Sequence, residues 1–94
     1  MTSTTEYLYY VLDLLRDIDN ITYKKMMGEY ILYCDGKIFG GIYDDRFLVK
    51  ITPSQDKYHF QKEIPYKNAK PMHLVDIENP EEIKELVENT LKEL

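Results

Sequence analysis

The sequence predicts an α+β domain in which an antiparallel sheet of about four to five strands packs against N- and C-terminal helices. Three observations predict this fold class. Apolar residues recur at helical spacing near both ends, and the period changes to two between Ile21 and Ile51. Asp35-Gly36 interrupts that second stretch with a sequence that favours a tight hairpin turn. No linker or repeat divides the 94 residues, so we expect a single domain over residues 1–94.

The first predicted helix runs from about Thr4 to Asp19. Ser3 and Glu6 have the spacing of a capping box, in which two side chains satisfy free backbone N–H groups at a helix start. The apolar positions of the segment lie on one helical stripe, which we expect to be buried: Leu8, Val11, Leu12, Leu15 and Ile18.

The predicted sheet begins at Ile21. We expect two-residue hairpin loops at Asp35-Gly36 and, on weaker grounds because neither residue is glycine, at Asp44-Asp45. With both loops of two residues, Tyr33 lies opposite Ile38 and Gly40 opposite Val49. One face then collects apolar residues that the two helices could cover, and we interpret it as the core face: Ile31, Tyr33, Ile38, Ile42, Phe47, Val49 and Ile51.

The other predicted face is more apolar than an exposed antiparallel face usually is. Apolar and aromatic residues with a basic rim are typical of a contact surface. We therefore predict an interaction face formed by Tyr30, Leu32, Phe39, Tyr43, Leu48 and Lys50. An alternative stays open, in which residues 52–70 fold over this face with Tyr58 and Phe60 as the covering side chains.

The remaining segments complete the fold. Pro53-Ser54 could open a short helix through Phe60, and residues 71–77 read as a last strand. Asn79-Pro80 followed by two glutamates indicates a helix start, with Asn79 as the cap and the acids favourable to the helix dipole. The stripe of this C-terminal helix consists of Ile83, Leu86, Val87, Leu91 and Leu94.

Few residues suggest chemistry. Cys34, His59 and His73 are not spaced as a metal site, and no glycine-rich phosphate motif occurs. Turn chemistry explains Asp44-Asp45, with Arg46 as a local charge partner. We therefore expect no catalytic residue, no metal and no cofactor, and a protein that is not an enzyme.

Charge and composition limit the partners. The net charge of −5 arises entirely in residues 76–94, because seven acids there face two lysines while the acids and bases of residues 1–75 cancel. An acidic end disfavours direct nucleic-acid binding. A single cysteine, and no signal peptide or long apolar run, indicate a soluble cytoplasmic protein without a membrane segment.

Residues 23–51 resemble the signature of the TfoX/Sxy N-terminal domain family, in the form of a single-domain member. The residues that carry the resemblance are Met26-Met27-Gly28, Gly36-Lys37, Gly40-Gly41 and Asp44-Asp45-Arg46-Phe47-Leu48-Val49-Lys50, with Pro65-Tyr66 and Ala69-Lys70-Pro71-Met72 later in the chain. The resemblance implies a two-layer domain with a curved antiparallel sheet against helices. It also implies kinship to regulators of DNA uptake and natural competence.

Three functions follow as hypotheses. The leading one is a small protein-interaction module, a transcriptional co-regulator related to the competence regulators, which binds a protein partner or forms a homodimer. The second is a weak nucleic-acid-binding domain that uses Lys37, Arg46, Lys50 and the lysines up to Lys70. The third is a redox or enzymatic protein built on Cys34, whose thiolate Lys37 would stabilise from the opposite strand.

Overall fold

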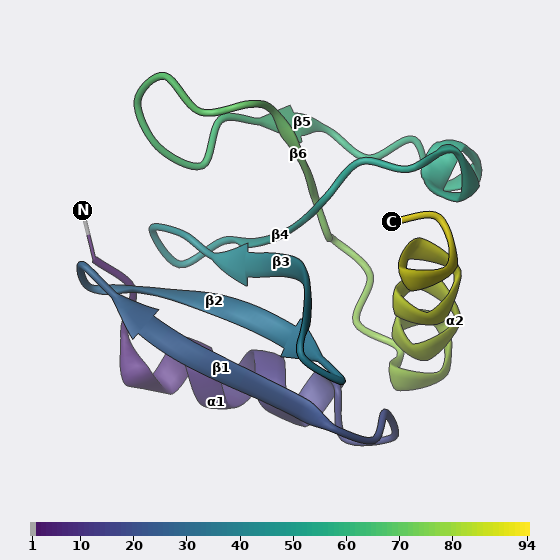
Figure 1. Cartoon of the computed structure of the whole chain (residues 1–94), viewed down its shortest axis with the longest axis horizontal. Helices are drawn as coiled ribbons and strands as arrows, with labels where there is room; N and C mark the ends of the chain where they lie inside the picture. Colours follow the sequence, from purple (N-terminus) through teal and green to yellow (C-terminus); the bar gives the residue numbers. More distant parts are fainter. Residues whose placement is uncertain (1) are drawn as a thin grey trace.

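The computed structural model describes residues 2–94 as an N-terminal helix, an open six-stranded antiparallel sheet and a C-terminal helix (Figure 1). The elements are α1 (Thr5–Leu14), β1 (Ile21–Met26), β2 (Glu29–Cys34), β3 (Lys37–Ile42), β4 (Phe47–Val49), the 3₁₀ helix η1 (Pro53–Tyr58), β5 (Lys62–Glu63), β6 (Met72–Leu74) and α2 (Pro80–Lys92). The strand order is β1-β2-β3-β4-β6-β5. The predicted α+β class is confirmed, and the short β5 adds to the expected strands.

Helix α1 is capped one residue later than the sequence indicated. The Thr4 hydroxyl accepts a hydrogen bond from the Tyr7 backbone N–H at 3.1 Å, whereas the Ser3 hydroxyl donates to Glu29 at 2.6 Å. The helix also ends at Leu14, before the predicted Asp19. Leu15 and Ile18 lie beyond the helix end but are still buried. The backbone there continues in hydrogen-bonded turns.

Three two-residue turns shape the first four strands. Met27-Gly28, Asp35-Gly36 and Asp44-Asp45 each have positive φ at both residues, between 52° and 83°. This is the type I′ geometry, whose twist matches the twist of paired strands. The turns at Asp35-Gly36 and Asp44-Asp45 confirm the predicted hairpins, and the turn at Met27-Gly28 adds a third.

A β-bulge between β2 and β3 changes the predicted register. Tyr33 does pair with Ile38, but Leu32 pairs with Gly40, which leaves Phe39 without a partner. Ile31 therefore faces Gly41 and not Gly40 as predicted. A one-residue slip exchanges the two faces of a strand, so β2 and the first half of β3 present the opposite faces to those predicted.

The core lies between one sheet face and the two helices. We call this the inner face, and it consists of Tyr30, Leu32, Phe39, Ile42, Phe47 and Val49, all buried. These side chains share one cluster with Leu8 and Val11 of α1 and Ile83 and Leu86 of α2. In Figure 1, α1 lies beneath β1 and β2, and α2 stands beside them at the right. Predicted core residues Ile31 and Tyr33 are half-buried, and Ile38 and Ile51 are exposed.

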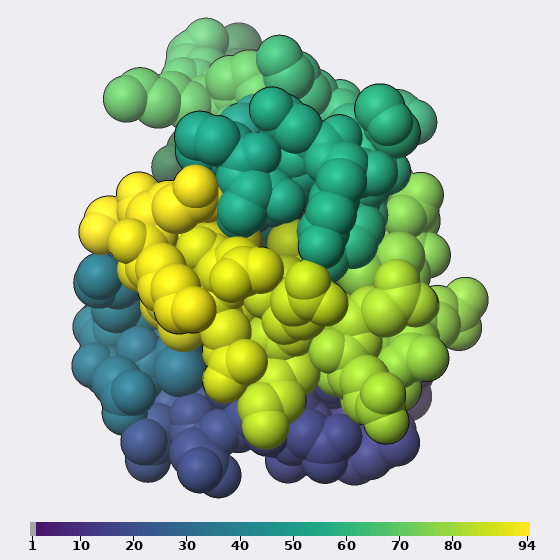
Figure 2. All heavy atoms as spheres, turned by 90° about the vertical axis from the view of Figure 1, so that its right-hand side faces the viewer, coloured from purple at the N-terminus to yellow at the C-terminus, as the bar shows by residue number. Residues whose placement is uncertain are grey.

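Helix α2 is capped as its sequence suggests, but Leu94 of the predicted stripe lies beyond the helix end and is exposed. The Asn79 side chain accepts hydrogen bonds from the backbone N–H groups of Glu81 and Glu82, at 2.8 and 3.4 Å. In Figure 2, α2 fills the middle of one side of the molecule and η1 lies against it. Between residues 2 and 94, no helix is long and apolar enough to cross a membrane.

A buried polar network joins η1, β6 and α2. The Gln55 amide nitrogen donates to the Lys50 carbonyl at 2.8 Å and to the Thr90 hydroxyl at 2.7 Å. Its oxygen lies 2.7 Å from His73 Nδ1. An amide oxygen only accepts, so the Nδ1 of His73 carries the proton that completes this bond.

Candidate interaction surface on the outer sheet face

The six residues of the predicted interaction face do not share one exposed surface. Tyr30, Leu32 and Phe39 belong to the inner face, and Leu48 is fully buried on the opposite side of the sheet. Tyr43 is half-buried and Lys50 is exposed. The prediction placed these residues together because it lacked the bulge at Phe39, and its grouping is wrong for the residues of β2 and for Phe39.

The opposite side of the sheet is also apolar, and it is less completely buried. We call it the outer face, and the register assigns to it Ile31, Tyr33, Ile38, Gly41, Tyr43 and Leu48. The loop between β5 and β6 (residues 64–71) crosses part of this face, because Tyr66 lies 6.0 Å from Tyr43 between ring centroids. The alternative that residues 52–70 cover this side is thus correct in part. The covering residues are Pro65 and Tyr66, whereas Phe60 packs into the core and Tyr58 stacks on it.

Two open hollows lie on either side of the Tyr43–Tyr66 pair. The first, about 720 Å³, is bordered by the β1–β2 turn and the start of the β5–β6 loop, and is lined by Met26, Met27, Glu29, Ile31, Tyr43, Asp44, Arg46, Ile64, Pro65, Tyr66 and Lys67. The second, about 680 Å³, is lined by Ile38, Gly40, Tyr43, Lys50, Ile51, Pro65, Tyr66, Ala69, Lys70, Pro71, Met72 and Leu94. Tyr43, Pro65 and Tyr66 border both, so the hollows form one continuous apolar surface.

Most exposed large apolar side chains within residues 2–94 gather here. Met26, Met27, Ile64 and Tyr66 are exposed around the first hollow, and Ile38, Ile51 and Leu94 around the second. Isolated exposed apolar residues are ordinary, whereas a contiguous group of this kind is a candidate contact surface. An apolar and partly exposed sheet face is therefore present, but most of its residues differ from those of the predicted interaction face.

Gly41 fixes the position of the Tyr43 ring. A Cβ atom at residue 41 would lie 2.6 Å from Tyr43 Cε2, so the ring rests directly over the bare backbone. Tyr30, in contrast, is paired with Ile42 and points to the core. The glycine thus allows Tyr43 to lie flat against the sheet, where it forms the floor between the hollows.

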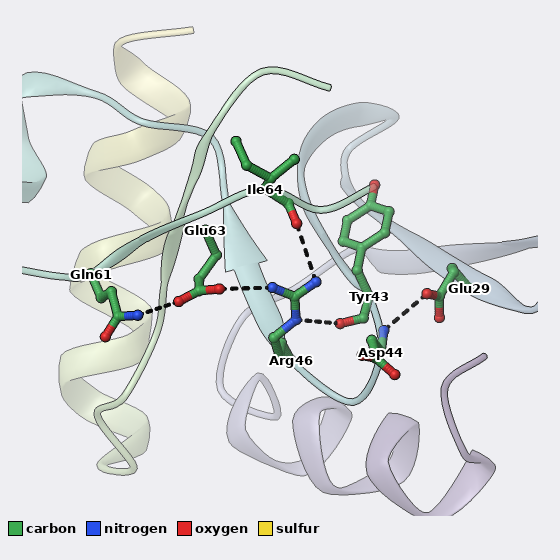
Figure 3. A network of polar contacts seen from close by, with 7 residues as sticks. All are labelled: Glu29, Tyr43, Asp44, Arg46, Gln61, Glu63 and Ile64. Carbon is green, nitrogen blue, oxygen red and sulfur yellow. Dashed lines mark hydrogen bonds and ion pairs between the residues drawn. The ribbon is translucent and has the colours of Figure 1, made fainter. Parts of the chain in front are cut away.

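Arg46 holds the β5–β6 loop in place (Figure 3). Its Nε donates to the Tyr43 carbonyl at 3.0 Å, and its terminal nitrogens donate to Glu63 at 2.9 Å and to the Ile64 carbonyl at 3.3 Å. The planar guanidinium has enough donors for all three acceptors. Its ion-pair partner is Glu63, not the neighbouring aspartates as the sequence suggested. Arg46 therefore ties the β3–β4 turn to the segment that borders the first hollow.

The Asp44-Asp45 turn is fixed from its other side. The Asp44 N–H donates to Glu29 at 2.9 Å, and the Asp45 N–H donates to the Ser3 hydroxyl at 3.0 Å. The Asp45 carboxylate accepts from the Thr4 N–H at 2.8 Å. Both aspartates therefore belong to a junction between the start of α1 and two hairpin turns, which agrees with the turn role that the sequence indicated.

Met27 occupies a strained and prominent position. It has φ of 52° in the tip of the first hairpin, and 92% of its surface is exposed. Left-handed backbone costs a residue other than glycine, asparagine or aspartate roughly 1 kcal/mol or more. A long apolar side chain held in such a conformation at the edge of an apolar hollow is suited to contact with a partner.

Cys34 lies away from this surface. Its side chain is buried beside Asp19, and burial, with the nearby Asp35 and Glu88 carboxylates, raises the pKa of its thiol. Lys37 is opposite Cys34 in the ladder as predicted, but its ammonium reaches the Leu94 carbonyl at 3.4 Å. A thiol with a raised pKa holds less nucleophilic thiolate. In the part of the chain that is described, no three His, Cys, Asp or Glu side chains are placed to hold a metal ion.

Comparison with known proteins identifies the family. The model of the TfoX N-terminal domain matches residues 13–93, which include every strand and α2. The chain belongs to the TfoX N-terminal domain family. A protein of Spirochaeta aurantia, described as an uncharacterized 12.7 kDa protein in the trpE 5′ region, is 32% identical over 78 residues, which cover 81% of this chain and 68% of the relative.

In this TfoX N-terminal domain, several residues that carry the family resemblance hold turns and loops together. Asp44, Asp45 and Arg46 connect α1, the hairpin turns and the β5–β6 loop, and Gly41 receives the Tyr43 ring. The exposed apolar residues around the hollows were not assigned to the contact face from the sequence. Met27 and Tyr66 are among the residues that carry the family resemblance. Period-two alternation alone, however, does not show which turns and loops fold back against the sheet.

Proposed function

We propose that this chain is a non-enzymatic protein-interaction module that binds its partner through the outer face. Membership of a competence-related family favours a role as a transcriptional co-regulator. The observation that carries the proposal is the continuous apolar surface around Tyr43 and Tyr66, bordered by exposed side chains of three separate segments.

The shape of the surface supports a macromolecular partner. Both hollows are wide and open to solvent, unlike the enclosed clefts that bury most of a small ligand. They are joined across the Tyr43–Tyr66 pair into a surface longer than either one. Tyrosine and methionine at its centre are residue types enriched at protein interfaces.

A matched pair of tyrosine variants tests the proposal. Tyr66 in the outer surface and Tyr9 on α1 are each 63% exposed, so Tyr66→Asp and Tyr9→Asp remove similar exposed apolar area. Proteins captured from extract of the source cells by immobilised wild-type chain should be retained by Tyr9→Asp and lost with Tyr66→Asp. Circular dichroism should give the same spectrum for all three chains.

Solution mass completes the test. Light scattering over a concentration series distinguishes a homodimer from binding to a different protein. A dimer that Tyr66→Asp converts to monomer would make a second copy the partner. Capture that is unaffected by Tyr66→Asp, together with a mass that it does not change, would refute an interaction through the outer face.

A further inference from the structure

The charges around the outer face restrict its partner. Lys67 lines the first hollow, and Lys50 and Lys70 line the second. Lys24 faces the same side, because it pairs with Ile31 across the β1–β2 ladder. All four lysines are exposed, and within residues 2–94 none of them forms an ion pair. Within the described part of the chain, the apolar surface therefore has four lysines without ion-pair partners on its rim.

The same region contains fewer acidic groups, and Glu29 and Asp44, which line the first hollow, balance part of the lysine charge. The two carboxylate oxygens of Glu29 accept from Ser3 and from the Asp44 N–H. Glu63 is paired with Arg46. Asp44 is the acid that lines the first hollow with an exposed side chain. The excess of acids lies instead on α2 and the residues before it, where seven acids accompany two lysines over residues 76–94.

This separation of charge selects among possible occupants. Two copies joined through the outer face would bring their lysine rims together, and like charges across an interface are costly. A nucleic acid would suit the lysines and the rings of Tyr43 and Tyr66, but most of the other apolar side chains that line the hollows are aliphatic: Met26, Met27, Ile31, Ile38, Ile51, Ile64 and Met72. Aliphatic side chains gain most from apolar side chains of a partner, whereas bases need stacking platforms.

We propose that the outer face binds an acidic segment of another protein that carries apolar anchor residues. The anchors fill the hollows on either side of the Tyr43–Tyr66 pair, and acidic residues between them face the lysine rim. This inference rests on the proposed interaction function and specifies the chemical class of the partner. It predicts an affinity that falls as ionic strength rises, because the rim lysines are exposed to solvent.

Peptide selection tests the proposal directly. The probe is a phage-displayed library of random peptides, about 16 residues long, which could span both hollows in extended form. Selection on immobilised wild-type chain should enrich peptides with net negative charge and several large apolar residues. Enrichment of basic or uncharged peptides would overturn the proposal, as would a selection that enriches no peptide.

Variants then locate the binding. The double variant Lys67→Gln and Lys70→Gln should lower the affinity for an enriched peptide at least about fivefold. Tyr66→Asp should lower this affinity further. Lys84→Gln with Lys92→Gln removes the same charge from α2 and should leave the affinity unchanged. Equal loss in both double variants would mean that net charge alone controls binding, and no loss in either would place the peptide elsewhere. Both results contradict the proposal.

Competing occupants are measured in the same assay. Single-stranded oligo(dT) that binds more tightly than every enriched peptide would make the surface a nucleic-acid site. A homodimer that Tyr66→Asp dissociates would make the occupant a second copy. If basic peptides are enriched while capture from extract still depends on Tyr66, the partner class is wrong but the interaction function stands. If capture is also independent of Tyr66, both proposals fail.

Discussion

The two faces of this sheet are made from alternate residues of the same strands, yet they differ in how completely other segments cover them. The inner face is covered by two helices, and Leu32, Phe39 and Ile42 are fully buried there. The outer face is covered in part by one loop, which leaves Ile38 and Ile51 exposed. The comparison shows that apolar alternation alone does not distinguish a core face from a binding face when both are apolar.

The difference depends on a single unpaired residue. Ile38 and Phe39 are neighbours in β3, but the bulge directs Phe39 into the core while Ile38 stays on the outer face with its partner Tyr33. Without the bulge, Ile38 and Ile42 would share a face, as the sequence analysis assumed. Bulges of this kind redirect side chains next to functional surfaces.

The largest expected effect comes from substituting these neighbours in turn. Phe39→Glu places a charge in a fully buried position and removes a large core side chain, which should cost at least about 4 kcal/mol and unfold the domain. Ile38→Glu changes a residue that is 36% exposed on the outer face, and should cost no more than about 1.5 kcal/mol. Urea unfolding followed by circular dichroism measures both.

The outcome would also separate the two registers. If Ile38→Glu unfolds the chain while Phe39→Glu remains folded, the unbulged register of the sequence analysis is correct. The bulged register requires the reverse order of stability. A chain that tolerates both substitutions would show that neither side of β3 contributes to the core.

Local sequence signals predicted much of the fold. The Asp35-Gly36 turn, the Asn79 cap and the short helix beginning at Pro53 depend on residues close together in the chain, and all are present. The bulge was not predictable in this way, because it depends on how Phe39 fits the core formed by distant helices. Face assignment in β2 therefore failed although Tyr33 was paired correctly with Ile38.

The candidate site was less predictable for a related reason. The sequence indicated an apolar sheet face with a basic rim, and Tyr43 and Lys50 do line the hollows. The other walls come from Met27 at a hairpin tip and from Ile64 and Tyr66 in a loop. The return of this loop to the sheet depends on Arg46, whose contacts with Glu63 and Ile64 join residues 17 and 18 positions apart.

The next largest effect concerns the buried polar network around Gln55. Gln55→Leu would leave the Lys50 carbonyl, the Thr90 hydroxyl and His73 Nδ1 without their present buried partner. Loss of partners for buried polar groups should lower the free energy of unfolding by about 1–3 kcal/mol. Gln61→Leu, at an exposed position, is the matched control and should change stability by less than about 0.5 kcal/mol in urea unfolding. Equal effects would deny the network a role in stability.

A smaller effect is expected where Arg46 holds the outer loop. Arg46→Met keeps much of the side-chain length but removes the bonds to Glu63, Tyr43 and Ile64, and should cost about 1–2 kcal/mol. Amide hydrogen exchange should accelerate in residues 64–71 more than in α1. The control Arg16→Met removes an exposed pair with Asp13 and should change stability by less than about 0.5 kcal/mol. Unchanged exchange in the loop would mean that Arg46 does not hold it.

The smallest effect is a dependence of stability on pH that arises at His73. Burial lowers the pKa of this imidazole, and Lys62 on the neighbouring strand lowers it further, while Asp56 acts in the opposite direction. In the unfolded chain the pKa returns to about 6.5. As the pH falls below that value, the unfolded chain takes up a proton that the folded ring still excludes, so the free energy of unfolding decreases until the folded pKa is reached.

Urea titrations between about pH 5.5 and 8 would measure this dependence, above the range in which carboxylates usually titrate. Stability should be constant from about pH 8 to 7 and should decline below 6.5. Glu93, whose pKa is lowered by hydrogen bonds from Ser54, loses its contribution only at more acidic pH and does not interfere. His73→Gln should remove most of the decline, whereas His59→Gln, at an exposed position, should retain it. A decline that survives His73→Gln would assign it to another group and would leave the Gln55 contact independent of pH in this range.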